Sequence, residues 1–200
     1  MTAQFILASG SPRRRQMLTD LGLQFEVRPA DIDETPAAGE APANYVLRLA
    51  REKAAAVAPG LVLAADTTVD FDGQILGKPA DRVEAIAMLQ RLSGRHHFVH
   101  TGVALGERSF VCSTLVTFRV LPPAEIEWYV DTGEPYDKAG AYGMQGRAAS
   151  MVASLTGSAT NVIGLPLAET VDLLRAAGII VMGDSGRNAE VTEFPTGRIR

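Results

Sequence analysis

The sequence contains few of the residues that mark disulfide-rich, metal-cluster or membrane proteins. Cys112 is the one cysteine among 200 residues, which excludes an intramolecular disulfide and a cysteine-ligated zinc cluster. The apolar runs fall far short of the roughly 20 residues that cross a bilayer. The positive charges near the N-terminus follow its short apolar stretch, the reverse of a secretory signal. We therefore expect a cytoplasmic protein that does not enter a membrane.

The chain also lacks an excess of positive charge. Its net charge of −4 argues against a protein that binds nucleic acid by general neutralisation of phosphates. Lysine is scarce: of 19 basic residues, only Lys53, Lys78 and Lys138 are lysines. A compact ammonium differs chemically from a planar guanidinium, so lysines kept in an arginine-rich chain indicate positions that use a point charge. Three incidental surface lysines are the alternative.

Several common catalytic motifs are absent. The sequence contains no GxxxxGK[ST] phosphate loop, no GxGxxG, no HExxH and no GxSxG. His96, His97 and His100 fall in one predicted strand, where His97 faces away from the other two and those two are about 13 Å apart. A shared metal site is therefore not expected there. Cys112 lies among apolar strand residues, which favours packing over nucleophilic catalysis.

The order of helix-like and strand-like segments predicts an α/β protein. Strands are expected at residues 4–8, 24–28, 61–65, 96–105, 109–121, 150–155 and 179–182. Helices are expected at residues 12–21, about 45–60, 81–93, 123–131 and 166–177. We expect a single domain over residues 1–182, with one mixed sheet flanked by helices, two lobes and a cleft between them. Residues 183–200 are expected to form a flexible tail.

The stretch LASGSPRRR, residues 7–15, has the features of an anion site. A Gly/Ser loop connects a strand to a helix that Ser11 caps and Pro12 begins, so free backbone N–H groups point to one place. Arginines at 13–15 follow in the first turn, where the helix dipole disfavours positive charge unless a bound anion offsets it. This pattern favours phosphate binding; a solvated basic face is the alternative.

Two acidic positions are candidates for metal binding or proton transfer. Asp66 directly follows the predicted buried strand 61–65, which would place it at the strand end where ligands bind in open α/β sheets. Asp66 could ligate a metal, act as a general base or simply cap the strand. Asp31, Asp33 and Glu34 form an acidic loop that could hold Mg²⁺; an ordinary solvated loop would look the same.

Taken together, these residues resemble the Maf family of nucleoside triphosphate pyrophosphatases. The resemblance extends in order from residue 5 to about residue 182 and includes all three lysines. The matching stretches are LASGSPRRR (7–15), Asp33-Glu34, REKA (51–54), AADTTV (64–69), ILGKP (75–79), YDKAGAY (136–142) with Gln145-Gly146, and NVIGLPL (161–167).

The resemblance implies a Maf-like, inosine-triphosphatase-like fold with a mixed twisted sheet and a deep cleft, in a cytoplasmic homodimer. It also implies hydrolysis between the α- and β-phosphates with Mg²⁺ or Mn²⁺, and a link to septum formation. Carried over by position, Ser9, Arg14, Lys53 and Lys78 would bind phosphates. Glu34 and Asp66 would bind the metal, and Asp66 would be the general base.

The family is divided by substrate at three positions, which here are Arg13, Thr67 and Gln145. Members acting on 7-methyl-GTP have Trp and Glu at the positions of Arg13 and Gln145, which suits a positively charged base. A glutamine amide instead matches the N–H and carbonyl of a pyrimidine dione. The expected substrates are therefore dTTP and UTP, possibly with modified pyrimidine nucleotides. A pyrophosphatase for 7-methyl-GTP or another modified purine, and a non-catalytic cell-division regulator, are the alternatives; the intact set Asp66, Lys78 and Glu34 favours an enzyme.

Overall fold

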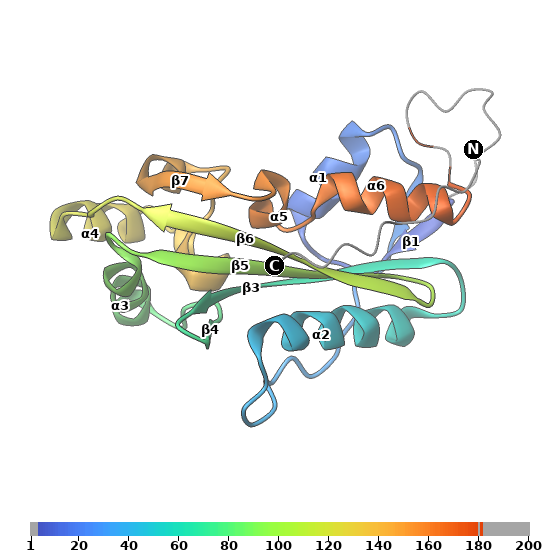
Figure 1. Cartoon of the computed structure of the whole chain (residues 1–200), viewed down its shortest axis with the longest axis horizontal. Coiled ribbons are helices and arrows are strands. Elements are labelled where there is room, and N and C mark those ends of the chain that lie inside the picture. Colours follow the sequence, from blue (N-terminus) through green and yellow to red (C-terminus); the bar gives the residue numbers. More distant parts are fainter. Residues whose placement is uncertain (1–3, 180, 182–200) are drawn as a thin grey trace.

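The computed structural model describes residues 4–179 and 181, and over these residues it shows one mixed sheet of seven strands flanked by helices (Figure 1). The strands are β1 (Phe5–Leu7), β2 (Phe25–Val27), β3 (Val62–Phe71), β4 (Gln74–Leu76), β5 (His96–Leu105), β6 (Arg108–Phe118) and β7 (Val152–Thr156). The helices are α1 (Pro12–Asp20), α2 (Pro42–Val57), α3 (Arg82–Leu92), α4 (Pro123–Asp131), α5 (Ala159–Ile163) and α6 (Leu167–Ala176). Three short 3₁₀ helices lie at Glu134–Asp137 (η1), Ala139–Ala141 (η2) and Arg147–Met151 (η3).

The strand order is β2-β1-β3-β5-β6-β7, with β4 paired to β3. β1 runs parallel to β2 and β3, whereas β3, β5, β6 and β7 pair antiparallel. The expected Asp72-Gly73 hairpin joins β3 to β4, and both residues have positive φ, as a two-residue turn of this type requires. The predicted α/β class with a mixed sheet is confirmed.

Most of the predicted elements are present, but β3 differs from the prediction in a way that matters for the site. The strand expected at 61–65 continues to Phe71, so Asp66 lies inside β3 and the expectation that it follows the strand end is wrong. The apolar run stops at Asp66 because Asp66, Thr67 and Thr68 are polar residues that line the cleft. The strand nevertheless continues, because Thr67, Thr68 and Val69 are β-branched residues that favour the extended conformation.

Other differences are smaller. The helix α5 and the three 3₁₀ helices were not predicted, because each is too short to show a clear periodicity. A final strand was predicted at 179–182, but Ile179 and Val181 belong to no strand, and residues 180 and 182 lie outside the described part of the chain. The predicted tail at 183–200 also lies outside it.

Two apolar clusters share one face of the long strands β3 and β5. One packs α1 and α6 against the sheet, around Leu63 and Val103, and the other packs α3, α4 and the 3₁₀ segments, around Val69 and Val99. Since side chains alternate along a strand, the residue between Val99 and Val103 on this face is Thr101. A polar group therefore separates the two clusters.

Hydrogen bonds satisfy this buried polar group. Thr67 and Thr101 share a hydrogen bond of 2.9 Å between their hydroxyls, and the Thr101 hydroxyl donates to the Asn161 carbonyl at 3.1 Å. The Asn161 amide in turn donates to the Val99 carbonyl and the Thr114 hydroxyl, at 2.9 and 3.0 Å. These bonds tie α5 to the middle of the sheet and place polar atoms where the apolar core is interrupted.

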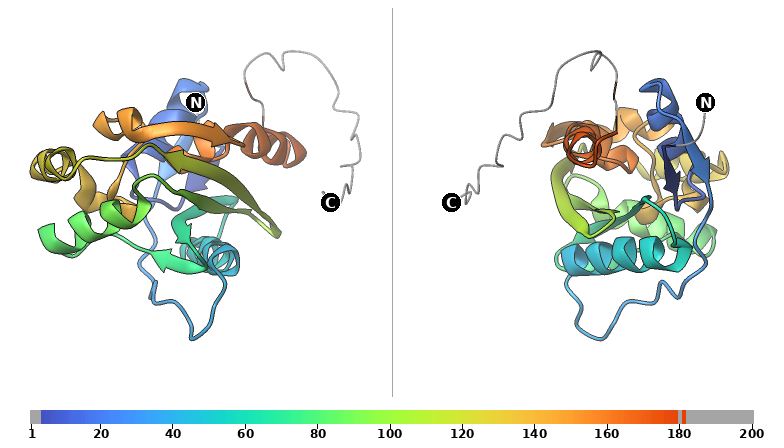
Figure 2. Two further views of the ribbon diagram at one scale, coloured as in Figure 1. Left: turned by 60° about the vertical axis from the view of Figure 1, so that its left-hand side comes forward. Right: turned by 90° about the vertical axis from the view of Figure 1, so that its right-hand side faces the viewer.

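Helix α2 covers the opposite face of the sheet, away from α1 and α6 (Figure 2). It approaches closely because small residues face it: a Cβ added at Gly102 would lie 2.2 Å from the Val46 carbonyl oxygen. Ala64 and Ala104 lie in the same interface. Lys53 occupies the buried side of this helix together with Val46 and Leu49, so the close approach brings its ammonium group to the sheet.

Candidate active site

A cleft with a volume of about 440 Å³ opens at a gap along the edge of β3. On the side away from β5, β1 pairs with Val62 and Leu63 and β4 pairs with residues 69–71, and no described strand pairs with β3 between them. Side chains from both faces of the sheet can therefore reach the gap. All nine residues predicted to form the site line this cleft: Ser9, Arg13, Arg14, Glu34, Lys53, Asp66, Thr67, Lys78 and Gln145.

Arg14 is a buried cation of the cleft. Its Nε donates to the Gly164 carbonyl at 2.7 Å, and its two terminal nitrogens donate to Ser9 Oγ at 3.1 Å and to Thr67 Oγ1 at 2.9 Å. Burial lowers its pKa below the ordinary arginine value. Within the described part of the chain, the hydrogen bonds of this buried guanidinium all go to neutral oxygens. Its positive charge is therefore held rigidly and can be compensated by a bound anion.

The loop before α1 adds backbone donors beside Arg14. The Ser11 side chain accepts from the Arg14 N–H at 3.4 Å as the N-cap, Pro12 begins the helix, and the first turn contains no acidic residue. Ser9 Oγ accepts from the Ser11 N–H at 3.3 Å and so fixes the loop as well as the guanidinium. The predicted anion site at this loop is thus built around a helix N-terminus that opens into the cleft.

Lys53 joins the two predicted metal-binding carboxylates. Its Nζ lies 2.6 Å from Asp66 Oδ1 and 2.6 Å from Glu34 Oε1, so these two oxygens are no more than about 5 Å apart. Asp66 is buried and Glu34 is exposed. The Tyr45 hydroxyl donates to the Glu34 carbonyl at 2.9 Å, which anchors the acidic loop to α2. Burial together with the negative charges of Asp66 and Glu34 raises the pKa of Tyr45 to about 12, so this hydroxyl stays protonated.

These two carboxylates fit a Mg²⁺ or Mn²⁺ ion that takes its other ligands from water and phosphate oxygens. The described residues contain no group of three or more acidic, histidine or cysteine side chains that could hold a metal alone. Of the acidic loop, Glu34 lines the cleft, whereas Asp33 accepts a hydrogen bond from the Thr35 N–H at 2.9 Å. The donor set therefore suits an ion that binds together with a phosphorylated substrate.

The histidines and the cysteine lie outside the cleft. His97 is buried against Tyr142, while His100 hydrogen-bonds Ser113 and Asp70 on the other face of the sheet. Burial and the nearby Glu169 raise the pKa of Cys112 to about 11, so its thiol stays protonated at neutral pH. His97 and His100 therefore lie on opposite faces of the sheet, and the Cys112 thiol is not held as a thiolate.

Lys78 and Gln145 enter the cleft from the wall opposite α1. Lys78 is exposed and forms no ion pair with any residue of the described chain, so its charge is available to a ligand. Gln145 is exposed in the turn after η2. The Gly140 N–H donates to the Gly77 carbonyl at 3.0 Å, which holds the two segments together.

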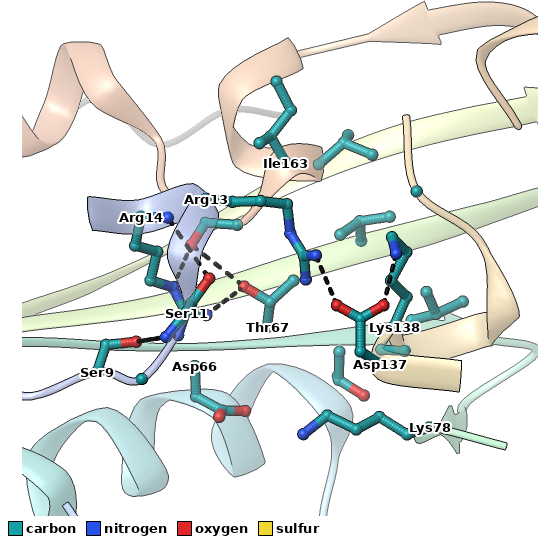
Figure 3. Close-up of a pocket in the computed structure, with 18 of the residues that line it drawn as sticks. Ser9, Ser11, Arg13, Arg14, Asp66, Thr67, Lys78, Asp137, Lys138 and Ile163 are labelled. Atoms are coloured by element: carbon teal, nitrogen blue, oxygen red, sulfur yellow. Dashed lines mark hydrogen bonds and ion pairs between the residues drawn. The ribbon is translucent and has the colours of Figure 1, made fainter. Parts of the chain in front are cut away.

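Two charged cleft residues had been given no role from the sequence: Asp137 and Lys138. Asp137 Oδ2 lies 3.0 Å from Arg13 Nη1, and Asp137 Oδ1 lies 2.5 Å from Lys138 Nζ. Figure 3 shows this Asp137 carboxylate between the two cations, to one side of Arg14 and Asp66. The stretch YDKAGAY contained both residues, but a charged pair in a glycine-rich loop carries no sequence signal for a contact with α1.

Known proteins are similar to this sequence over most of its length. Residues 4–177 match the family model described as Maf-like protein. The chain is 58% identical over 181 residues to a dTTP/UTP pyrophosphatase from Myxococcus xanthus (strain DK1622), covering 87% of this chain and 92% of the relative. It is 55% identical over 186 residues to the dTTP/UTP pyrophosphatase of Anaeromyxobacter dehalogenans (strain 2CP-1 / ATCC BAA-258), covering 89% and 96%. It is 52% identical over 192 residues to the dTTP/UTP pyrophosphatase of Symbiobacterium thermophilum, covering 92% of this chain and 99% of the relative.

The described helices include none that combines the length and the apolar character of a membrane span.

Proposed function

This chain belongs to the Maf family, and we propose that it is a nucleoside triphosphate pyrophosphatase that hydrolyses dTTP and UTP to the monophosphate and pyrophosphate. The observation that carries the proposal is the charge arrangement of the cleft. Buried Arg14 is held by neutral oxygens, and it shares the cleft with Lys53, which bridges Glu34 and Asp66. Fixed cations beside paired carboxylates are what a metal–triphosphate substrate requires.

The phosphates would be bound by Arg14, Lys53 and Lys78, with Ser9 and the N-terminus of α1. A triphosphate carries close to four negative charges, so several cations are needed to bind it and to stabilise the charge of the leaving pyrophosphate. Arg14 contributes a rigid fork, whereas exposed Lys78 contributes a mobile point charge. Because the Arg14 guanidinium is fixed before the reaction, it needs little reorganisation in the transition state.

Glu34 and Asp66 would hold a divalent cation, which when bound supplies charge neutralisation and polarises the phosphate oxygens. We assign Asp66 as the general base. A water molecule attacks phosphorus at the α–β linkage, its proton passes to the Asp66 carboxylate, and the bridging P–O bond breaks to release pyrophosphate. Lys53 orients the Asp66 carboxylate by its 2.6 Å contact with Oδ1.

Arg13, Thr67 and Gln145 would select the base. A glutamine amide offers one donor and one acceptor, which match the carbonyl and N–H of thymine and uracil. The Thr67 hydroxyl is bonded to Arg14 and Thr101, so it also connects the base-selecting group to the phosphate-binding arginine. We further propose that the protein works as a homodimer in the cytoplasm, where its nucleotide substrates occur.

The test is pyrophosphate release from dTTP, UTP, CTP, ITP, GTP and 7-methyl-GTP with Mg²⁺ or Mn²⁺, for wild type and Asp66→Asn. Turnover of dTTP and UTP that falls by about 10²–10⁴-fold in a folded Asp66→Asn variant supports the proposal. Turnover of 7-methyl-GTP instead would retain the reaction and overturn the base assignment. If a folded wild-type protein hydrolyses none of them, the enzyme assignment is wrong and a nucleotide-binding regulator of cell division becomes the better hypothesis.

A further inference from the structure

One ion-paired bridge crosses the cleft at the side away from Arg14. It joins Arg13 on α1 to Asp137 in η1 and continues to Lys138 (Figure 3). The Lys138 ammonium also donates to the Glu134 carbonyl at 2.7 Å. Among the ion pairs of the described residues, the Arg13–Asp137 pair alone connects α1 with the segment 134–147. The two oxygens of one carboxylate thus hold one cation from each wall of the cleft.

The bridge is too exposed to serve mainly for stability. The side chains of Arg13 and Asp137 are 29% and 62% exposed, and ion pairs with such access to water contribute about 0–1 kcal/mol. The consequence of the pair is therefore geometric: it restricts where the Arg13 guanidinium lies.

The segment that carries Asp137 is packed tightly against the turn that carries Gln145. A Cβ added at Gly143 would lie 2.3 Å from the Lys138 Cε. A Cβ added at Gly146 would lie 2.1 Å from Glu134 Oε1, whose carboxylate also accepts from the Arg147 N–H at 3.2 Å. Fixing Arg13 to Asp137 therefore also fixes Arg13 relative to Gln145.

The chemistry of a pyrimidine dione suits such a pair of side chains. Uracil and thymine present two carbonyl acceptors on either side of one N–H, whereas cytosine replaces one carbonyl with an amino group. Arginine can only donate hydrogen bonds, so a guanidinium held at that carbonyl favours the dione and disfavours cytosine. Asp137 uses Arg13 Nη1, which leaves the Nη2 group to face a base.

We propose that Asp137 is a positioning residue for base selection, which holds the Arg13 guanidinium in register with Gln145 so that both contact a thymine or uracil ring. The proposal rests on the proposed function for the identity of the nucleotide and for the assignment of Arg13 and Gln145 to the base. Asp137 acts through Arg13 and touches no reacting atom. Burial alone would raise the pKa of Asp137, but hydrogen bonds from Lys138 and Arg13 outweigh burial and lower it, so the carboxylate is charged at neutral pH.

The test compares Asp137→Asn, Asp137→Glu and a matched control, Asp131→Asn. Asp131 forms a similar exposed pair with Arg82, at 2.7 Å, between α3 and α4, and does not line the cleft. Binding of UTP, dTTP and CTP is measured by calorimetry in EDTA, and kcat and KM with Mg²⁺. In Asp137→Asn we expect the affinity for UTP and dTTP to fall about tenfold and their KM to rise about tenfold, with kcat nearly unchanged and CTP unaffected. The Glu variant should recover part of the UTP preference, and the control should retain all of it.

The same measurement with Arg13→Ala separates positioning from other roles. Once Arg13 is absent, Asp137→Asn should cause no further loss of the UTP-to-CTP ratio, because Asp137 acts through that side chain. Equal losses for UTP and CTP, an additive loss in the double variant, or an unchanged ratio in Asp137→Asn would each overturn the proposal. Calorimetry in EDTA needs no turnover, so it tests base selection separately from hydrolysis. If wild type binds UTP selectively but does not hydrolyse it, the proposed reaction is wrong, and the binding data for Asp137→Asn still decide this inference.

Discussion

The cations of the cleft differ in how each residue is supported. Arg14 is buried and held by three neutral oxygens, Lys53 is buried between two carboxylates, and Lys78 is exposed with no ion-pair partner in the described chain. A buried charge without a carboxylate in contact costs folding free energy, which a bound polyanion recovers. At the residue scale, the site is therefore arranged for a highly charged ligand and not for the stability of the free protein.

A buried histidine outside the cleft makes stability depend on pH. His97 Nε2 lies 2.8 Å from the Tyr142 hydroxyl, and its Nδ1 has no hydrogen-bond partner among the described residues. Burial, with a smaller effect of His96, lowers the pKa of His97 to about 4. Between pH 6.5 and pH 4 the unfolded chain therefore binds a proton that the folded protein does not, so stability falls as the pH falls. The expected loss is up to about 3 kcal/mol.

His97→Phe should remove this contribution. Urea unfolding of wild type and variant between pH 7 and pH 4 measures it: the variant should lose less free energy of unfolding over that range than wild type, whatever its stability at pH 7. The matched control is His96→Gln at the neighbouring exposed position, which should keep most of the wild-type slope because burial is the larger cause of the His97 shift. Parallel curves for His97→Phe and wild type would contradict the assignment.

At the scale of elements, the distance between α2 and the sheet determines where Lys53 lies. Gly102→Ala would place a methyl group 2.2 Å from the Val46 carbonyl oxygen, and backbone on both sides prevents relief by a rotamer change. We expect a loss of about 3 kcal/mol in urea unfolding, in the upper part of the range for overpacked interiors. Because α2 must move outward, the remaining folded protein should also hydrolyse dTTP more slowly.

Gly77→Ala is the control for stability. No atom lies within 4 Å of a Cβ added there, and the backbone at this glycine does not have positive φ. It should unfold within about 0.5 kcal/mol of wild type. If Gly102→Ala is as stable as this control, the close packing of α2 is not needed for the fold.

At the scale of the whole molecule, the cleft lies where two apolar clusters meet across a polar group. A ligand that contacts both Arg14 and Lys78 joins α1, which packs in one cluster, to the segment after β4, which packs in the other. A nucleotide bound only to the folded state should then stabilise the whole molecule by about 2.7 kcal/mol at a concentration 100 times its dissociation constant.

This stabilisation can be measured without turnover. We expect dTTP in EDTA to raise the melting temperature of wild type, and dTMP, which lacks the β- and γ-phosphates, to raise it much less. Arg14→Ala should abolish most of the difference between the two nucleotides. Equal shifts for dTTP and dTMP would mean that the cleft does not recognise the triphosphate.

The sequence alone determined most of the longer elements, because their signals are local. Ser11-Pro12 begins α1, Asp72-Gly73 forms the hairpin, and apolar periodicity defines α2 and α6. The family resemblance named nine cleft residues, and the structure brings all nine to one cavity. Their individual roles remain predictions, since proximity alone does not assign chemistry.

What only the tertiary structure decided were relations between distant segments. Asp66 was expected at a strand end, but it lies inside β3, and it lines the cleft because β1 and β4 leave part of that strand edge unpaired. The pair Arg13–Asp137 joins residues 124 positions apart. Neither follows from local propensity, because a gap in a sheet and a contact across a cleft depend on how the whole chain packs, and no local pattern in either segment encodes its partner.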